Sequence, residues 1–363
     1  MERVRISPLQ GAMLLVTTIT STAIILLPGA IAGRDAWLAT LGGLAVGLVM
    51  AVTISFLGQR FPGETIIEYT EILLGKYIGK TVSALFLTFF GYLAALTLWD
   101  FGVFISSSLL VGTPMMAINI IGILVATYTA RYGLEVIARV NQIFLPLIII
   151  SVLLASIIVF TMPKTSLAHI LPVLENGTKP LLAGTAKVAD WLGEVIVLSM
   201  VIPFLYPQKH SRSVAMVSVL ISSLILLLVS LVVVATFGDI SPTLFFPFYS
   251  AVLLIEISRV LRLDVVITTI WIIGSFIKIS FLLYILAHGT AQWFKLVKHN
   301  FLIMPLAVII LSLSLIILKS VAEYQSISLQ ISGYLLFISL VLPAFLLLTA
   351  IITGRTTGKK DVK

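Results

Sequence analysis

A lysine in the middle of an apolar segment is the residue of this chain most able to do chemistry. Lys278 lies at the centre of WIIGSFIKISFLL, inside an apolar run that we place at 264–287. At 1.5 Å per residue it is about 21 Å and 14 Å from the ends of that run, too deep for its side chain to reach a membrane surface. A charge at that depth costs roughly 2.5–3.5 kcal/mol, so the ammonium group needs a partner or water. Such a group can carry a proton, or organise oxygen atoms as a bound cation does.

Carboxylates in two other apolar segments are candidate partners. Glu194 follows Gly193 in DWLGE, and we predict that it pairs with Lys278 at similar depth while Gly193 forms a hinge. Gly193 and Glu194 are also candidate ligand contacts. Asp100 lies in the outer third of its segment, where it either guards a vestibule or reaches interfacial water. Asp190 is expected at the outer interface. The alternative for Lys278 is a purely structural ion pair that locks two helices together.

Hydroxyl side chains are concentrated in the first apolar segment, where TTITST occupies residues 17–22. Hydroxyls can bond the backbone groups that a helix break sets free, and they can line a polar pocket. We therefore predict a break at Thr20 and Ser21, with both residues contacting a ligand. Ordinary helix packing, with the hydroxyls bonded to their own helix, is the alternative. Thr97, in the third apolar segment, is a further candidate ligand contact.

Several kinds of chemistry are excluded or lack any pattern in the sequence. There is no Cys, which excludes disulfides, thiolate catalysis and cysteine metal sites. The four His residues are scattered without the spacing of metal ligands. The net charge of +8 comes from basic residues in short loops rather than on one face, so nucleic acid is not an expected partner. We expect no enzyme activity, no metal and no cofactor.

The composition identifies an integral membrane protein, because 60% of the 363 residues are hydrophobic and only 10% are charged. Apolar runs long enough to span a bilayer, straight or tilted, recur along the whole chain. We place ten of them, at 9–31, 36–58, 81–110, 115–130, 140–161, 181–205, 214–237, 264–287, 301–318 and 331–353.

Ten spans suggest two sets of five, here 1–161 and 181–353, within a single transmembrane domain 1–363. An odd number of spans in each set makes the second enter the membrane from the opposite side, which gives an inverted repeat. In such a fold the first helix of each set is broken near the middle of the membrane. We therefore expect an all-α membrane protein in which the first and sixth helices are broken.

The orientation follows from the basic residues near the ends of the spans. With the N-terminus inside, 15 of the 23 Lys and Arg residues lie on the cytoplasmic side. Another 7, among them Lys187, lie on the outer side, and Lys278 is the one that remains. Since basic residues concentrate on the cytoplasmic side, both termini are expected there, with a basic tail at 354–363.

Short motifs along almost the whole chain resemble one known family, the B subunits of spore germinant receptors. No single motif is decisive, but their order and spacing together are fairly specific. The motifs are ISPLQ at 6–10, LLP at 26–28, DAW at 35–37, RFPGETIIEY at 60–69, LG at 74–75, IG at 78–79, LPVL at 171–174, GE at 193–194, and RLD at 262–264 with Trp271.

The resemblance implies membership of the amino acid–polyamine–organocation superfamily, with a LeuT-like fold of ten helices. It also implies a nutrient-sensing role in the inner membrane of a bacterial endospore, beside an A subunit and a lipoprotein C subunit. Sodium-coupled relatives of this fold hold an ion between the first and eighth helices, which is where Lys278 would stand. The chain departs from the family at Thr20 and Ser21, which replace a glycine pair often found at the first helix break. This puts in doubt how closely the backbone there approaches a ligand carboxylate.

Three functions follow from these observations. The first is a receptor subunit that binds a small nutrient, an amino acid, near the middle of the lipid bilayer between the first, third, sixth and eighth helices. The second is a proton-coupled amino acid transporter of the same fold, in which Lys278 or Glu194 takes up and releases the proton. The third is a scaffold without a ligand, or a subunit that conducts ions or water.

Overall fold

The computed structural model describes residues 5–255 and 263–356, and these residues form helices joined by short loops. Part of the predicted basic tail, 357–363, and Arg262 of the RLD motif lie outside the described residues. The α-helices are α1 (Pro8–Leu26), α2 (Ala36–Arg60), α3 (Ile66–Leu74), α4 (Lys76–Ser108), α5 (Met115–Arg131), α6 (Leu134–Phe160), α7 (Thr178–Leu192), α8 (Leu198–Val201), α9 (Ser211–Phe237), α10 (Pro247–Leu253), α11 (Leu263–Trp293), α12 (Asn300–Ile316), α13 (Val321–Leu336) and α14 (Leu342–Thr353).

Shorter helices of other types connect or interrupt these. Six are 3₁₀ turns, and η7 is a π-helix that joins α13 to α14 within one long span. They are η1 (Pro28–Asp35), η2 (Leu167–Ile170), η3 (Gly193–Val197), η4 (Ile202–Phe204), η5 (Gln208–His210), η6 (Gly238–Thr243) and η7 (Phe337–Val341).

The membrane spans agree with the prediction. Among the described residues, seven helical stretches are long and apolar enough to cross a membrane, and α5 and α12 are shorter apolar helices. The remaining predicted span, 181–205, is present as a chain of short pieces, α7, η3, α8 and η4. All ten predicted spans are therefore helical, and the all-α membrane fold is confirmed. The division into repeats at 1–161 and 181–353 stays a prediction.

The first span differs from the expectation, because α1 is helical without interruption through Thr20 and Ser21. The Thr20 hydroxyl donates to the Val16 carbonyl at 2.6 Å. A hydroxyl that bonds the carbonyl four residues earlier supports the helix from within instead of accompanying a break. The helix ends only at Leu27, which adopts a left-handed conformation (φ 46°) before Pro28 begins η1.

The sixth span is broken at Gly193, as expected. The α-helical part ends at Leu192, and a 3₁₀ stretch follows before the short α8. A Cβ atom at Gly193 would lie 2.5 Å from the hydroxyl oxygen of Ser339 in η7 and 2.9 Å from its Cβ. Only glycine lets the broken segment come this close to the π-helix.

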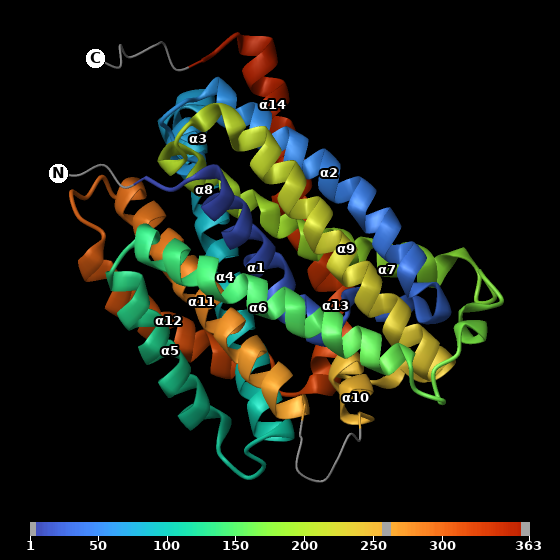
Figure 1. Ribbon diagram of the computed structural model, residues 1–363. Helices are drawn as coiled ribbons and strands as arrows, with labels where there is room; N and C mark the ends of the chain where they lie inside the picture. Colours follow the sequence, from blue (N-terminus) through green and yellow to red (C-terminus); the bar gives the residue numbers. More distant parts are fainter. Residues whose placement is uncertain (1–4, 256–262, 357–363) are drawn as a thin grey trace.

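The helices form one bundle in which α1 is largely enclosed (Figure 1). The helix α1 packs against α9, α6 and α11, while α2 packs against α9 and α7. The helix α4 packs against α11, and α5 and α12 pack on this pair. In Figure 1, α1 begins and α14 ends at the same end of the bundle.

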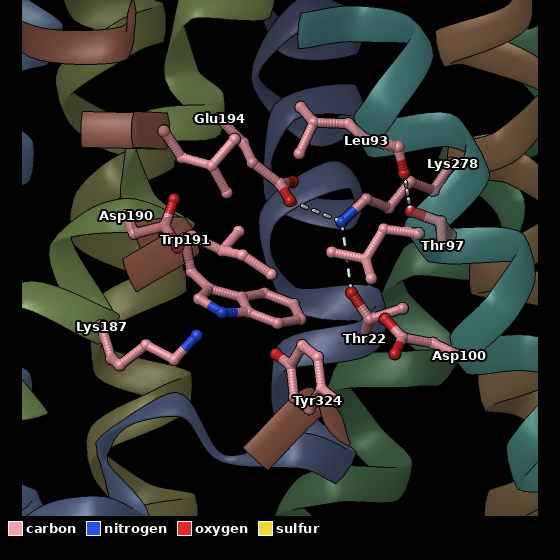
Figure 2. A pocket seen from close by; sticks show the side chains of 13 residues that line it. Thr22, Leu93, Thr97, Asp100, Lys187, Asp190, Trp191, Glu194, Lys278 and Tyr324 are labelled. Carbon is pink, nitrogen blue, oxygen red and sulfur yellow. Dashed lines mark hydrogen bonds and ion pairs between the residues drawn. The ribbon is translucent and has the colours of Figure 1, made fainter. Parts of the chain in front are cut away.

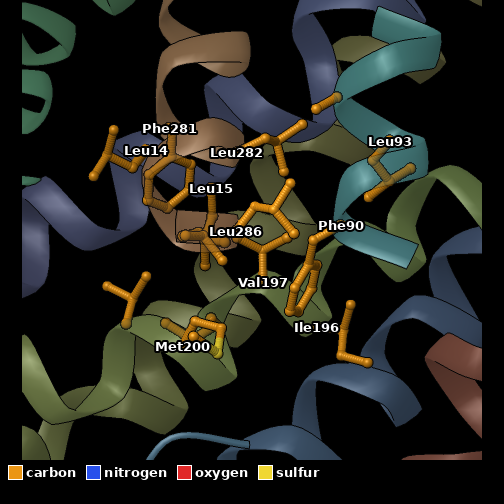
Figure 3. Packing of buried hydrophobic residues seen from close by; sticks show 14 of the residues in the cluster. Leu14, Leu15, Phe90, Leu93, Ile196, Val197, Met200, Phe281, Leu282 and Leu286 are labelled. Atoms are coloured by element: carbon orange, nitrogen blue, oxygen red, sulfur yellow. The ribbon is translucent and has the colours of Figure 1, made fainter. Parts of the chain in front are cut away.

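Apolar side chains fill the bundle centre between the start of α1 and the middle of the molecule (Figure 3). Lipid is as apolar as these side chains, so their contribution comes from close packing more than from exclusion of water. The labelled residues of this cluster come from α1, α4, η3, α8 and α11. They are Leu14, Leu15, Phe90, Leu93, Ile196, Val197, Met200, Phe281, Leu282 and Leu286.

Main-chain hydrogen bonds join the beginning of α1 to the end of the sixth span. The Ile6 N–H donates to the Phe204 carbonyl at 2.9 Å, and the Tyr206 N–H donates to the Ile6 carbonyl at 3.0 Å. They form an isolated parallel bridge between Ile6 and Leu205. We call this contact the N-terminal bridge.

At the opposite end of the bundle a single arginine joins three connecting segments. Arg34 in η1 forms an ion pair with Asp239 in η6 and another, at 3.1 Å, with Glu175. Its guanidinium also donates to the Leu171 carbonyl at 2.6 Å. The loops at this end are therefore held together by charge.

Candidate functional site

A small, partly polar cavity lies where α1, α4, α7, η3, α11 and α13 meet (Figure 2). Side chains leave little free room inside it. We call it the central cavity. Its lining residues are Thr22, Leu93, Leu96, Thr97, Asp100, Lys187, Asp190, Trp191, Glu194, Lys278, Tyr324, Ile331 and Leu335.

Lys278 and Glu194 form an ion pair in this cavity, as the sequence predicted. The Lys278 Nζ lies 2.8 Å from Glu194 Oε1 and donates to the Thr22 hydroxyl at 3.2 Å. The same ammonium group lies 5.4 Å from the centre of the Trp191 ring. Lys278 is 1% exposed, so it pairs entirely within the protein. It thereby joins α11 to α1 and to the broken sixth span.

Two further charged residues of the cavity were assigned wrongly from the sequence. Lys187, which we counted with the outer loops, is buried in α7 and donates to the Ser328 carbonyl at 3.1 Å. Asp190, expected at the outer interface, is buried and accepts a hydrogen bond from Ser332 at 2.8 Å. The physical reason is that this face of α7 turns toward α13 inside the bundle, where polar groups of α13 replace water.

The spacing along α7 contains a signal that would have identified them. Lys187, Asp190, Trp191 and Glu194 recur at intervals of three, four and seven residues from the first. Residues at these intervals lie on one face of a helix. A polar face within an apolar segment indicates a polar interior.

Asp100 lines the cavity from α4 and is 4% exposed. Within the described part of the chain, its Oδ1 has no hydrogen-bond partner. Thr97, one turn earlier, also lines the cavity, and its hydroxyl donates to the Leu93 carbonyl at 2.7 Å. The site therefore contains three carboxylates and two ammonium groups.

Three of the residues predicted to contact a ligand do not line the central cavity. The hydroxyl of Thr20 is bonded within α1, and Gly193 faces Ser339 and Met50. Ser21 borders a separate, mostly apolar cavity of about 440 Å³ between α1, α6, α10 and α11. The neighbouring Thr22, which the sequence gave no reason to prefer within TTITST, faces the central cavity instead.

A larger cavity of about 820 Å³, lined by residues of α1, η1, α7, η6 and α13, adjoins the central cavity, and we call it the vestibule. Lys187, Trp191 and Tyr324 line both. These three side chains therefore stand between the vestibule and the central cavity, so a ligand that passes from one to the other must move them.

Comparison with known proteins decides the family. The family model described as "Spore germination protein" matches residues 5–323. The chain belongs to this family. It is 29% identical to spore germination protein KB of Bacillus subtilis (strain 168) over 357 residues, which cover 97% of this chain and 96% of that protein. It is also 24% identical to spore germination protein YndE of the same organism, over 80% of this chain and 82% of that protein. The predicted family resemblance is confirmed.

Two solved transporter structures resemble the spore germination chain in fold. Mhp1, a nucleobase–cation–symport-1 family transporter in a closed conformation with bromovinylhydantoin bound, matches with a TM-score of 0.72. The match is 14% identical and covers 97% of this chain and 80% of Mhp1. MhsT in complex with L-phenylalanine matches with a TM-score of 0.67 at 14% identity, covering 98% and 91% of the two chains. The LeuT-like fold is thus confirmed.

Proposed function

We propose that this spore germination protein is a nutrient-sensing membrane subunit of a germinant receptor, and that it binds a small ligand, an amino acid, in the central cavity. The observation that carries the proposal is the set of charges around that cavity. Charges inside a membrane protein are costly and mark functional sites. The charged lining residues are Asp100, Lys187, Asp190, Glu194 and Lys278, all of them buried.

Of the residues predicted from the sequence, we assign Thr97, Asp100, Glu194 and Lys278 to the ligand site, because each lines the cavity. Thr20, Ser21 and Gly193 are not assigned to ligand contact. Gly193 acts indirectly, since it allows the break that brings Glu194 to the cavity.

Binding would bias the protein toward one arrangement of the broken sixth span. The Lys278 ammonium joins α11 to Thr22 of α1 and to Glu194 of η3, so it holds these elements in one register. A ligand that enters from the vestibule displaces Trp191 and Tyr324 and favours the arrangement that accommodates it. The change would then pass to A-type and lipoprotein C-type subunits in the inner membrane of the spore. The positive-inside pattern supports cytoplasmic termini.

A second candidate function is proton-coupled amino acid transport. The specific observation that favours it is the buried Lys278–Glu194 pair, because a carboxylate and an ammonium group in contact can exchange protons with a moving substrate. The similar folds of Mhp1 and MhsT are compatible with transport.

Thermal unfolding of the purified full chain tests ligand binding. A ligand present at 100 times its Kd stabilises the folded state by about 2.7 kcal/mol, so the best-bound L-amino acids should raise the Tm. If no L-amino acid raises the Tm, the proposed ligand class is wrong.

Proteoliposomes with and without a pH gradient then distinguish the receptor function from the transporter function. A sensor should accumulate no radiolabelled ligand, whereas a transporter should accumulate it under the gradient.

A further inference from the structure

Among the described residues, two charged side chains of the central cavity, Lys187 and Asp100, form no ion pair. Lys187 Nζ contacts the Ser328 carbonyl and the face of Tyr324, with 5.3 Å to the ring centre. Asp100 Oδ1 has no hydrogen-bond partner in the described part of the chain. Both side chains are buried, at 7% and 4% exposure. The other charges of the cavity are engaged, by an ion pair between Glu194 and Lys278 and by the Ser332 hydroxyl at Asp190.

The two unpaired charges are of opposite sign and lie on opposite sides of the cavity. Figure 2 shows Lys187 on α7 and Asp100 on α4, with Tyr324 between them. A buried charge without a partner is strongly unfavourable. A molecule that carries a cationic group at one end and an anionic group at the other would compensate both charges at once.

We propose that Asp100 binds the ammonium group and Lys187 the carboxylate of a zwitterionic ligand, an inference that rests on the function proposed above. The rest of the ligand would meet Leu93, Leu96, Ile331 and Leu335, all of which are aliphatic. A charged ligand side chain would add a further unpaired charge among them. The specificity is therefore for an amino acid with a short aliphatic side chain, since little room is free.

The position of Lys187 also gives the ligand an order of contacts. Lys187 lines the vestibule as well as the central cavity, whereas Asp100 lines only the central cavity. The carboxylate of an incoming ligand therefore meets Lys187 first, and the ammonium group reaches Asp100 only once Trp191 and Tyr324 have moved.

Ligand derivatives and matched variants test each contact separately. Calorimetric titration of the purified full chain first identifies the tightest binder among glycine, L-alanine, L-valine and L-leucine. The same titration then uses its N-acetyl derivative, which lacks the ammonium group, and its amide, which lacks the carboxylate. Loss of a charge-assisted hydrogen bond should weaken binding by about tenfold or more for each derivative.

Each variant should abolish the difference in Kd between the free amino acid and one of the two derivatives, and should keep the difference for the other derivative. In Asp100→Asn, the free amino acid and its N-acetyl derivative should bind with similar Kd, while the amide remains weaker. In Lys187→Gln, the amide should match the free amino acid, while the N-acetyl derivative remains weaker. Asp35→Asn is the matched control, because this buried carboxylate accepts a hydrogen bond from the Leu174 N–H outside the central cavity, and both ratios of Kd should stay at the wild-type values.

Two outcomes would overturn this inference while leaving the proposed function intact. One is an amino acid that binds the wild type and whose Kd ratios to its two derivatives are the same in Asp100→Asn and in Lys187→Gln as in the wild type. Another is wild-type protein that binds both derivatives as tightly as the amino acid, a result that needs no variant to fold. Binding of a neutral sugar and of no amino acid would overturn both this inference and the ligand class of the proposed function. If the wild type binds no small molecule at all, the proposed function itself fails.

Discussion

The first and sixth spans lie side by side at the centre of the bundle, and they differ in whether the α-helix is continuous. The first carries the hydroxyl-rich TTITST and remains one continuous helix. The sixth is interrupted at Gly193. Hydroxyls satisfy carbonyls of their own helix and keep it intact, whereas the missing Cβ of glycine admits a neighbouring element. The comparison shows that the break occurs where glycine allows the close approach of Ser339, and that the hydroxyl-rich sequence does not break its helix.

Lys278 connects the two spans that differ in this way, because it bonds Thr22 of the first and Glu194 of the sixth. Replacement by Met keeps much of the side chain and removes the charge, so Glu194 is left buried without its cation. Breaking a buried pair typically costs about 3–5 kcal/mol. We expect the largest loss of Tm, and loss of the ligand response or of its pH dependence, in Lys278→Met.

Two further variants serve as controls for that prediction. Glu194→Gln combined with Lys278→Met removes the stranded carboxylate and should recover part of the Tm. Lys278→Arg should rescue only partly, because a planar guanidinium does not fit contacts made by a compact ammonium group. A Lys278→Met protein with wild-type Tm, ligand response and pH profile would contradict the proposed role.

Gly193→Leu should separate the sixth span from η7 by steric clash with Ser339 rather than by filling the central cavity. Overpacking of this kind costs about 1–3 kcal/mol, and ligand affinity should fall because Glu194 is displaced. Thermal unfolding and ligand titration measure the two effects. Gly193→Ala should be milder, and Ser339→Gly in the same chain should restore its Tm. Failure of that restoration would show that the contact with η7 does not determine the break.

Within α1, the loss of stability on removing a hydroxyl should depend on whether that hydroxyl bonds a charged group or a carbonyl of its own helix. Thr22→Val removes the acceptor at 3.2 Å from the Lys278 ammonium group, and hydrogen bonds to charged groups contribute about 1.5–3 kcal/mol. Thr20→Val removes only an uncharged bond to the carbonyl of Val16 in the same helix, and such a bond contributes about 0.5–1.5 kcal/mol. Equal losses of Tm in both variants would contradict this distinction.

The smallest effect on function is expected from single cysteines placed before and after the sixth span, one in the loop that follows α6 and one in the first turn of α9. Lys164→Cys and Ser213→Cys are exposed positions in a chain that has no native cysteine. An impermeant thiol reagent should label them from opposite sides of the membrane, with Lys164→Cys outside. Ser211 is buried and unsuitable for this purpose. Labelling of both cysteines from the same side would show that the broken span does not cross.

Much of the fold could be predicted from the sequence because its strongest signals are local. The apolar runs predicted the membrane spans. The depth of Lys278 in its span, together with a similar depth for Glu194, predicted the ion pair between them. Lys187 was counted on the outer side because hydropathy alone does not reveal which face of a helix turns inward. The contact between Gly193 and Ser339 joins residues far apart in the sequence, and no local pattern encodes it. The lack of a hydrogen-bond partner for Asp100 Oδ1 among the described residues likewise depends on elements distant in the sequence.

The continuity of α1 makes the N-terminal bridge more than a local contact. From Pro8 to Thr22 the helix is a rod about 21 Å long, at 1.5 Å per residue. If a change in the central cavity tilts α1 at Thr22, the other end of this rigid helix is displaced sideways, and Ile6 moves with it. The bridge itself consists of main-chain bonds, so a substitution deletes one of them only where proline removes an N–H. The position of Ile6 would thus depend on the state of a cavity that this residue does not line.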